Sequence, residues 1–299
     1  MGIKDILVRL YVAKREKYSG TVLKYEGVTV ERNVRYGERK TQTFSLYRKS
    51  ERVLPVIINF HDGAVAGRNK NTRRALCVSL ASQLDVAVMN VEYKGETSLG
   101  VKRCLKETEK ILEYLGEHHK SLALNPDKVF LLGDGIGAYV ASSLALLNGK
   151  YNVNVLGVIG LCGLYDTIGH AKENQYYATQ YHLMKTFFDI DLKLATDREV
   201  VRALDETSVN RTLSEDYPPC FIAHTIHDEF LPTQGEVMVK ALKQQRVSVW
   251  EFKVVGERLY HNFFLEKKSN ASRSMLSYLK EFVEEALRGG IYRNEYREI

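Results

Sequence analysis

The chain has 299 residues, 44% of them hydrophobic, and a formal charge of +6 from 43 basic and 37 acidic residues. This composition is typical of a globular protein, and because charges of both signs are mixed along the chain it favours neither a nucleic-acid nor a membrane partner. The four widely spaced cysteines form no Cys-x-x-Cys pair, as in a reduced protein. No secretory signal or run of about 20 apolar residues is evident. We therefore expect a single cytoplasmic domain, residues 1–299.

The strands and helices predicted along the chain alternate. After a short helix at 3–18, alternating apolar and polar residues at 28–36 and 41–47 predict an antiparallel strand pair. Short apolar runs predict buried strands of a mainly parallel sheet, at 53–60, 86–91, 129–132, 155–161, 220–224 and 247–255. Apolar residues three or four apart predict helices between them, at 71–83, 101–115, 234–244 and 275–287. This alternation predicts an α/β fold with a sheet covered on both faces.

The segment from about 165 to 216 interrupts the alternation. It is polar and aromatic, has helical spacing and contains no strand-like run. An insertion of this length between two strands is most simply a helical lid over the carboxyl edge of the sheet. Its aromatic residues either line a pocket or pack the lid against the core. The final nine residues, IYRNEYREI, carry no clear assignment.

The stretch VFLLGDGIGAYVASS, from Val129 to Ser143, joins a buried strand to a helix through a sharp glycine-rich turn. It resembles the nucleophile elbow Gly-x-Ser-x-Gly of α/β-hydrolases, in which the middle residue presents a hydroxyl to the substrate. Here the middle residue is Gly135. The turn is therefore present, but the position of the nucleophile is vacant.

Several further segments resemble the hormone-sensitive-lipase-like branch of the α/β-hydrolases and its small carboxylesterase and acetyl esterase relatives, over about 28 to 287. In that branch a His-Gly-Gly-Gly loop follows a buried strand and helps to form the oxyanion hole. The corresponding residues here are His61-Asp62-Gly63-Ala64. The resemblance implies backbone donors at Gly63, Ala64 and Ile136. Asp62 departs from the pattern, because it places an acid close to a site meant for negative charge.

The same resemblance implies the other two members of a catalytic triad. The acid is expected after the strand that follows the lid, and Asp228-Glu229-Phe230-Leu231-Pro232 places it at Asp228. The histidine is expected after the next strand and shortly before an aromatic residue, which places it at His261. The order of nucleophile, acid and base is that of the α/β-hydrolase fold.

These positions predict an esterase scaffold for small acyl esters, acetyl esters included, that is inactive or nearly so. Without a hydroxyl at position 135 no acyl-enzyme can form there, and loss of a triad nucleophile costs on the order of a million-fold in turnover. Glycine also adopts the strained backbone of an elbow freely. Natural loss and deliberate replacement of a serine lead to the same sequence. The alternative function is non-catalytic binding of a ligand in the lidded pocket.

Other interpretations of these residues have less support. The glycine-rich turn lacks the Lys-Ser/Thr of a phosphate-binding loop and a convincing dinucleotide fingerprint. Asp134 lies one residue before the apex, which disfavours it as a nucleophile, and Cys162 has no evident base. Asp228 and His261 could instead be a surface acid and a structural histidine. His224 and His227 lack a third metal ligand. We predict no cofactor, no metal, and a small ester or ester-like ligand as the partner, and leave a homodimer open.

Overall fold

The computed structural model describes residues 27–62, 69–93, 100–174, 187–190, 196–256, 259–266 and 268–299. In these residues nine strands form one mixed sheet, in the order β1-β2-β4-β3-β5-β6-β7-β8-β9. Neighbouring strands from β4 to β9 run parallel, whereas the β1–β2 and β2–β4 pairs are antiparallel. The strands are β1 (Thr29–Arg35), β2 (Thr43–Arg48), β3 (Leu54–Phe60), β4 (Ala87–Glu92), β5 (Leu124–Asp134), β6 (Val155–Leu161), β7 (Cys220–Thr225), β8 (Val249–Val254) and β9 (Glu295–Glu298).

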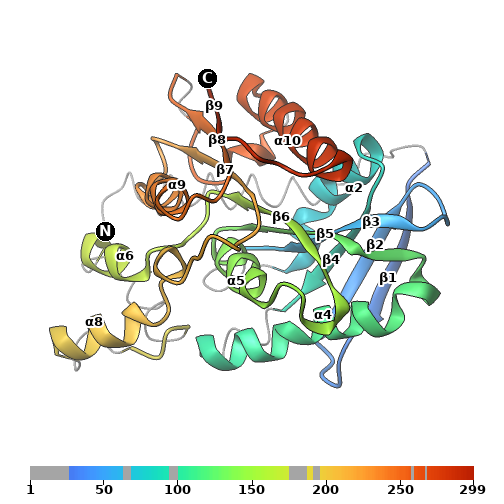
Figure 1. The fold of residues 1–299 in the computed structure, drawn as a ribbon, viewed down its shortest axis with the longest axis horizontal. Coiled ribbons are helices and arrows are strands. Elements are labelled where there is room, and N and C mark those ends of the chain that lie inside the picture. Colours follow the sequence, from blue (N-terminus) through green and yellow to red (C-terminus); the bar gives the residue numbers. More distant parts are fainter. Residues whose placement is uncertain are drawn as a thin grey trace.

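Helices cover both faces of the sheet (Figure 1). One apolar core lies between the sheet and α4, α5 and α9, and a second lies between the opposite face and α2 and α10. The predicted α/β fold, with a mainly parallel sheet flanked by helices, is thus confirmed. The longer helices are α2 (Arg74–Gln83), α4 (Val101–Leu122), α5 (Ile136–Leu144), α9 (Gln234–Gln244) and α10 (Asn270–Arg288).

Helical elements occupy the described part of the segment between β6 and β7. They are α6 (Thr167–Asn174), α8 (Asp197–Asp205) and the short η4 (Val209–Arg211). The rings of Phe187 and Phe188 pack edge-on against Tyr139 of α5, with centroids 5.8 and 5.6 Å away. These two side chains therefore belong to the core. The predicted helix at 3–18 and the tyrosines at 176, 177 and 181 lie outside the described residues. No helix in the described ranges has the length and apolarity to cross a bilayer.

The C-terminal tail forms a strand that the sequence did not predict. β9 adds to the edge of the sheet parallel to β8, so β8, α10 and β9 make one further strand–helix–strand unit. The strand is polar, and its residues alternate between exposed and partly exposed. Arg297 pairs with Glu281 of α10, and its guanidinium lies 3.9 Å from the ring centroid of Tyr278. Backbone pairing and contacts with α10 hold this strand, and neither leaves an apolar signature in the sequence.

Candidate active site

The loops that carry the predicted site residues all follow the carboxyl ends of parallel strands. His61 and Asp62 follow β3, Gly135 follows β5, Asp228 follows β7, and His261 follows β8. In a sheet of this kind, the crevice outside the carboxyl ends of the strands is the usual position of a ligand site. The topology therefore brings together residues that are up to 200 positions apart in the sequence (61 to 261).

Gly135 forms the apex of a tight turn between β5 and α5. Its backbone angles are φ 54° and ψ −121°, in the positive-φ region that glycine adopts without steric cost. Its N–H donates to the carbonyl of Leu161 at 3.3 Å, and its own carbonyl accepts from Leu164 N–H at 3.1 Å. These bonds fix the turn to the end of β6, so the geometry does not depend on the side chain at the apex.

The glycines on either side of the apex let the helix start close to the sheet. A Cβ atom on Gly137 would lie 2.0 Å from the carbonyl oxygen of Phe60, and one on Gly133 would lie 2.1 Å from the carbonyl oxygen of Gly137. Real Cβ atoms essentially never make such short contacts. The Gly-x-Gly-x-Gly spacing therefore brings α5 against β3 and its following loop.

Asp134, directly before the apex, is held by a buried ion pair. Arg73 donates from Nε to Asp134 Oδ1 at 2.9 Å and from a terminal nitrogen to Oδ2, and both side chains are fully buried. A two-pronged contact of this kind fixes the carboxylate in one orientation. Asp134 is thus a structural acid that anchors the turn to the start of α2, which agrees with its rejection as a nucleophile.

Asp228 and His261 form a buried hydrogen-bonded pair. Nδ1 of His261 lies 2.9 and 3.1 Å from the two carboxylate oxygens of Asp228, and both residues are 3% exposed. Oδ1 of Asp228 also accepts the backbone N–H groups of Phe230 and Leu231, at 3.0 and 2.9 Å. Because the carboxylate faces Nδ1, the proton of a neutral imidazole is placed there, and Nε2 is left as the basic nitrogen. This is the arrangement of a general base with its orienting acid.

The two loops that carry this pair are tied together. The hydroxyl of Thr225, at the end of β7, donates to the carbonyl of Leu259 at 2.7 Å. The ring of Phe230 stands edge-on to the His261 ring, with the centroids 5.3 Å apart. The position of the imidazole is therefore set from its apolar edge as well as from its acid partner.

Asp62 occupies the space beside the apex of the elbow. A Cβ atom on Gly135 would lie 2.6 Å from Asp62 Cγ and 2.8 Å from its Oδ1. Oδ1 accepts the backbone N–H of Ile136 at 3.3 Å, and Oδ2 lies 4.0 Å from His261 Nε2. One carboxylate oxygen thus contacts a predicted oxyanion donor, while the other faces the predicted base. The carboxylate lies where a side chain at position 135 would begin.

Buried contacts hold the backbone around Asp62. The Tyr93 hydroxyl donates to the carbonyl of His61 at 2.5 Å, and Nε2 of His61 lies 3.2 Å from Glu92 Oε1. Burial raises the pKa of Tyr93, and the nearby Asp62 carboxylate adds to this effect. Glu92 also accepts the N–H of Lys70 at 3.1 Å. The end of β4 therefore contacts both His61, directly after β3, and Lys70, at the start of the helical turn before α2.

The structure thus brings together Gly135, Ile136, Asp228 and His261, whereas Gly63 and Ala64 lie outside the described residues. The sequence interpretation missed the position of Asp62. It identified an acid near an anion site, but not that this acid fills the space at Gly135 and binds Ile136 N–H. The sequence did carry a signal, because it departs from the family pattern at two positions: a glycine stands at the apex of the elbow, and an acid stands in the loop after β3. In the structure, the side chain of the loop acid lies beside the apex glycine, which has no side chain of its own.

The structure gives little support to a metal at this site. Cys162, Asp228 and His261 offer ligand atoms within 4.8 Å of one another, but the histidine and the acid are in direct hydrogen-bond contact. Burial also raises the pKa of the Cys162 thiol, which opposes formation of the thiolate that would bind a metal or attack a substrate. His224, which was considered as part of a metal pair, has its Nε2 atom 2.9 Å from Glu251 Oε1, so a carboxylate satisfies the hydrogen bonding of this ring nitrogen. The absence of a metal stays a prediction.

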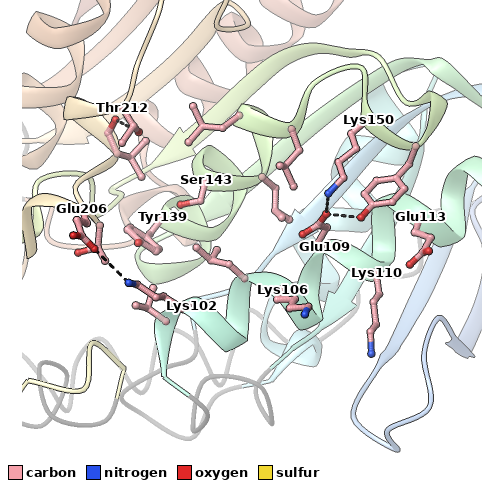
Figure 2. A pocket seen from close by; sticks show the side chains of 18 residues that line it. Lys102, Lys106, Glu109, Lys110, Glu113, Tyr139, Ser143, Lys150, Glu206 and Thr212 are labelled. Carbon is pink, nitrogen blue, oxygen red and sulfur yellow. Dashed lines mark hydrogen bonds and ion pairs between the residues drawn. The ribbon is translucent and has the colours of Figure 1, made fainter. Parts of the chain in front are cut away.

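A separate cavity of about 610 Å³ lies against α4 and the C-terminal end of α5 (Figure 2). None of the predicted site residues lines it. Several of its charges are paired with one another: Glu109 contacts both Lys150 and Tyr151, and Lys102 lies 3.3 Å from Glu206. These pairs are typical of a solvated surface hollow.

Comparison with known proteins identifies the class to which this fold and site belong. A family profile described as alpha/beta hydrolase fold matches residues 57–265. An acetyl esterase of Salmonella schwarzengrund (strain CVM19633) is 24% identical over 200 residues, which cover 66% of this chain and 61% of that protein. An acetyl esterase of Salmonella choleraesuis (strain SC-B67) is 23% identical over 200 residues, which again cover 66% of this chain and 61% of that protein. The match thus spans about three fifths of these curated relatives.

Solved structures show the same fold. Esterase B from Lactobacillus rhamnosis, in an inhibited form, superimposes with a TM-score of 0.77 at 20% identity, covering 95% of this chain and 96% of that one. A bacterial heroin esterase superimposes with a TM-score of 0.76 at 17% identity, covering 94% and 91%. The chain belongs to the α/β-hydrolase fold family, which confirms the predicted resemblance to that fold.

Proposed function

We propose that this chain is a hydrolase scaffold for small acyl esters, acetyl esters included, that lacks its serine nucleophile and is inactive or nearly so by the acyl-enzyme route. Gly135 offers no hydroxyl, whereas Asp228 and His261 retain the geometry of an acid–base pair. The acetyl esterase relatives support the ester class. The observation that carries the proposal is the Asp62 carboxylate, which takes up the space next to Gly135.

Two defects, rather than one, separate this site from an active esterase. The N–H of Ile136, a predicted donor to a substrate oxyanion, is bonded to Asp62. A fixed negative charge at this place opposes the negative charge that develops on an ester oxygen in the transition state. Because a serine Cβ would lie 2.6 Å from Asp62 Cγ, a serine at position 135 also requires the carboxylate to move.

The test compares four chains with phenyl acetate as the substrate: wild type, Gly135→Ser, Asp62→Gly and the double variant. We expect the double variant to exceed the wild type by at least about a thousandfold in kcat/KM, because a triad nucleophile is worth on the order of a million-fold. Gly135→Ser alone should recover less than about a tenth of that gain. Adding His261→Gln to the double variant should abolish the activity, which shows that the site carries it.

Two results would contradict the proposal. A folded double variant without activity would show that the rest of the site is not an esterase site. A wild type that hydrolyses phenyl acetate as fast as the double variant, with the rate lost in His261→Gln, would show that the site needs no serine.

The second candidate function is binding of a small ester-like ligand without turnover. It is favoured by the buried Asp228–His261 pair, which keeps its two backbone donors although the nucleophile is absent. Since the wild type is expected not to consume esters, phenyl acetate itself serves as the probe in a calorimetric titration. Saturable binding that His261→Ala weakens supports this function, and a flat titration of the folded chain excludes it for this ligand. Cytoplasmic location and the absence of nucleic-acid and membrane partners stay predictions.

A further inference from the structure

The hollow beside α4 and the end of α5 has an apolar floor beneath its charged rim (Figure 2). Leu105 of α4 and Leu147, in the helical turn after α5, are partly buried and pack against the core. Leu146, in the same turn, is 43% exposed. A concave site of about 610 Å³ with an apolar surface and a few polar groups is typical of small-molecule binding. The charge pairs at the rim are thus only part of what the hollow offers to a ligand.

Three lysines, four residues apart, follow one another along the α4 side of the hollow. Lys102 pairs with Glu206 at 3.3 Å, and Lys110 pairs with Glu107 at 2.8 Å. Lys106 lies between them on the helix (Figure 2). Within the described ranges, no carboxylate lies within 4.0 Å of the Lys106 ammonium. The rim therefore has one cation without an ion-pair partner in this part of the chain, and it stands beside the apolar floor.

A strained turn forms part of the opposite wall. Tyr151 and Asn152 have φ angles of 61° and 53°, in the left-handed region that residues with a side chain rarely adopt. The turn lies so close to α4 that a Cβ atom on Gly116 would be 2.1 Å from the carbonyl oxygen of Tyr151. This position lets Lys150 and the Tyr151 hydroxyl donate to Glu109, whose charge is thereby compensated. Backbone strain is frequent where a structure holds a ligand.

We propose that this hollow binds a medium-chain alkyl carboxylate, with the chain along the apolar floor and the carboxylate at Lys106. Four lysines and three glutamates line the hollow, so the rim favours an anion. Glu113 would repel the ligand, but it is seven residues beyond Lys106, about 10 Å along the helix axis. The head group is therefore expected at the Lys106 end. This site is separate from the candidate active site, so the inference does not depend on the proposed function.

The charge pattern favours a ligand with a single negative charge over an acidic helix of a partner protein. A helix lying in a groove makes contacts every three or four residues along its length. An acidic helix would therefore need several cations in a row, whereas Lys102 and Lys110 already contact glutamates of this chain. One cation beside an apolar floor matches one carboxylate on an alkyl chain.

The first test is a calorimetric titration of the full chain with butanoate, hexanoate, octanoate and decanoate, each below the concentration at which it forms micelles. The Kd should fall about two- to fourfold for each added methylene, because each one leaves water for the floor. At equal chain length, octan-1-ol should bind about two- to fivefold more weakly than octanoate, since it lacks the charge. Octylammonium should bind more weakly still.

Two substitutions with matched controls locate the ligand. Leu146→Asp should weaken decanoate binding at least about tenfold, because it places a like charge on the floor. Val53→Asp, at a side chain that is 64% exposed and outside the hollow, is its control. Lys106→Glu should weaken binding about fivefold. Lys120→Glu, near the end of the same helix and outside the hollow, should change it less than twofold.

Loss of affinity in Leu146→Asp and Lys106→Glu, with both controls unchanged, supports the proposal. If no carboxylate of the series saturates the folded wild type, or if both variants bind decanoate as the wild type does, the proposal is wrong. A loss in His261→Ala instead would place the ligand in the ester site and contradict it. Preferential binding of an acidic amphipathic peptide would assign the hollow to a partner helix and also overturn it. None of these outcomes depends on a serine at position 135, so this inference and the proposed function fail separately.

Discussion

Two halves of the candidate site differ in how closely they match the predicted esterase arrangement. In the half formed by the loops after β7 and β8, Asp228 and His261 are in direct contact, and two backbone N–H groups hold the acid. In the half formed by the loops after β3 and β5, the elbow keeps its backbone, but its apex has no side chain and a carboxylate from the other loop lies beside it. The acid–base half thus has both of its predicted side chains in contact. The nucleophile half lacks a hydroxyl at its apex and has the Asp62 carboxylate beside it instead.

The backbone geometry of this site and its side-chain chemistry can therefore change separately. The elbow depends on three glycines and on hydrogen bonds to Leu161 and Leu164, none of which needs a hydroxyl at position 135. The acid–base pair, by contrast, consists of the side chains of Asp228 and His261, so replacing either residue removes it. We expect substitutions that disturb the backbone of the elbow to act mainly on stability and packing, and those around Asp228 and His261 to act also on the orientation of the imidazole.

The largest expected effect on stability in the nucleophile half comes from breaking the buried Arg73–Asp134 pair. Arg73→Met leaves an uncompensated carboxylate at full burial, which we expect to lower the free energy of unfolding by about 3–5 kcal/mol. Urea denaturation measures it. Arg52→Met, which removes an exposed partner of Asp85, is the control and should change stability by less than about 0.5 kcal/mol. Equal effects of the two substitutions would contradict an anchoring role for Arg73.

A smaller loss is expected from Gly137→Ala. The added Cβ would lie 2.0 Å from the carbonyl oxygen of Phe60, so α5 must move away from β3. Overpacking of this kind costs about 1–3 kcal/mol. Gly289→Ala is the matched control, since no atom outside its neighbours lies within 4 Å of the added Cβ. Thermal unfolding of both variants distinguishes a local clash from a general effect of replacing glycine.

In the acid–base half, Thr225→Val removes the hydrogen bond to the Leu259 carbonyl and the weaker one that the hydroxyl accepts from His227 N–H, and it keeps the shape of the side chain. We expect a loss of about 1 kcal/mol in stability. Thr29→Val, at an exposed hydroxyl that donates to the carbonyl of Arg48, is the control and should have a smaller effect. In the serine-restored double variant, Thr225→Val should also reduce kcat more than it changes KM, because the imidazole is less well oriented.

The smallest effect concerns pH and the Glu251–His224 pair beneath the acid–base half. Burial, the largest single influence, opposes ionisation of Glu251, but the hydrogen bond from His224 together with the nearby charges of His224, Lys243 and Lys253 outweighs it and lowers the pKa of the carboxyl. A carboxyl with a lowered folded-state pKa stabilises the fold above its unfolded-state pKa, and this contribution is lost as the pH falls through the folded-state value. Glu251→Gln should therefore flatten the acid limb of the stability curve. An unchanged limb would show that the pair contributes nothing.

Much of the fold could be predicted, because buried parallel strands leave continuous apolar runs and amphipathic helices leave a period of three to four. β9 could not, since its polar residues are held by backbone pairing with β8 and by ion pairs with α10. The strand that each site residue follows could also be predicted, because the apex of the elbow, the acid and the histidine each come shortly after an apolar run. The position of Asp62 could not, because it depends on how two loops 73 residues apart (62 to 135) approach each other in space.

The position of the Asp62 carboxylate beside Gly135 can be tested directly by a double-mutant cycle on the free energy of unfolding, with the wild type, Asp62→Gly, Gly135→Ser and the double variant. If the carboxylate occupies the space next to Gly135, serine at this position should destabilise the wild type more than it destabilises Asp62→Gly. The difference should be about 1–3 kcal/mol, which lies within the range for residues in contact. Additivity of the two substitutions within about 0.5 kcal/mol would contradict a contact between Asp62 and a side chain at position 135, because distant, independent sites behave in that way.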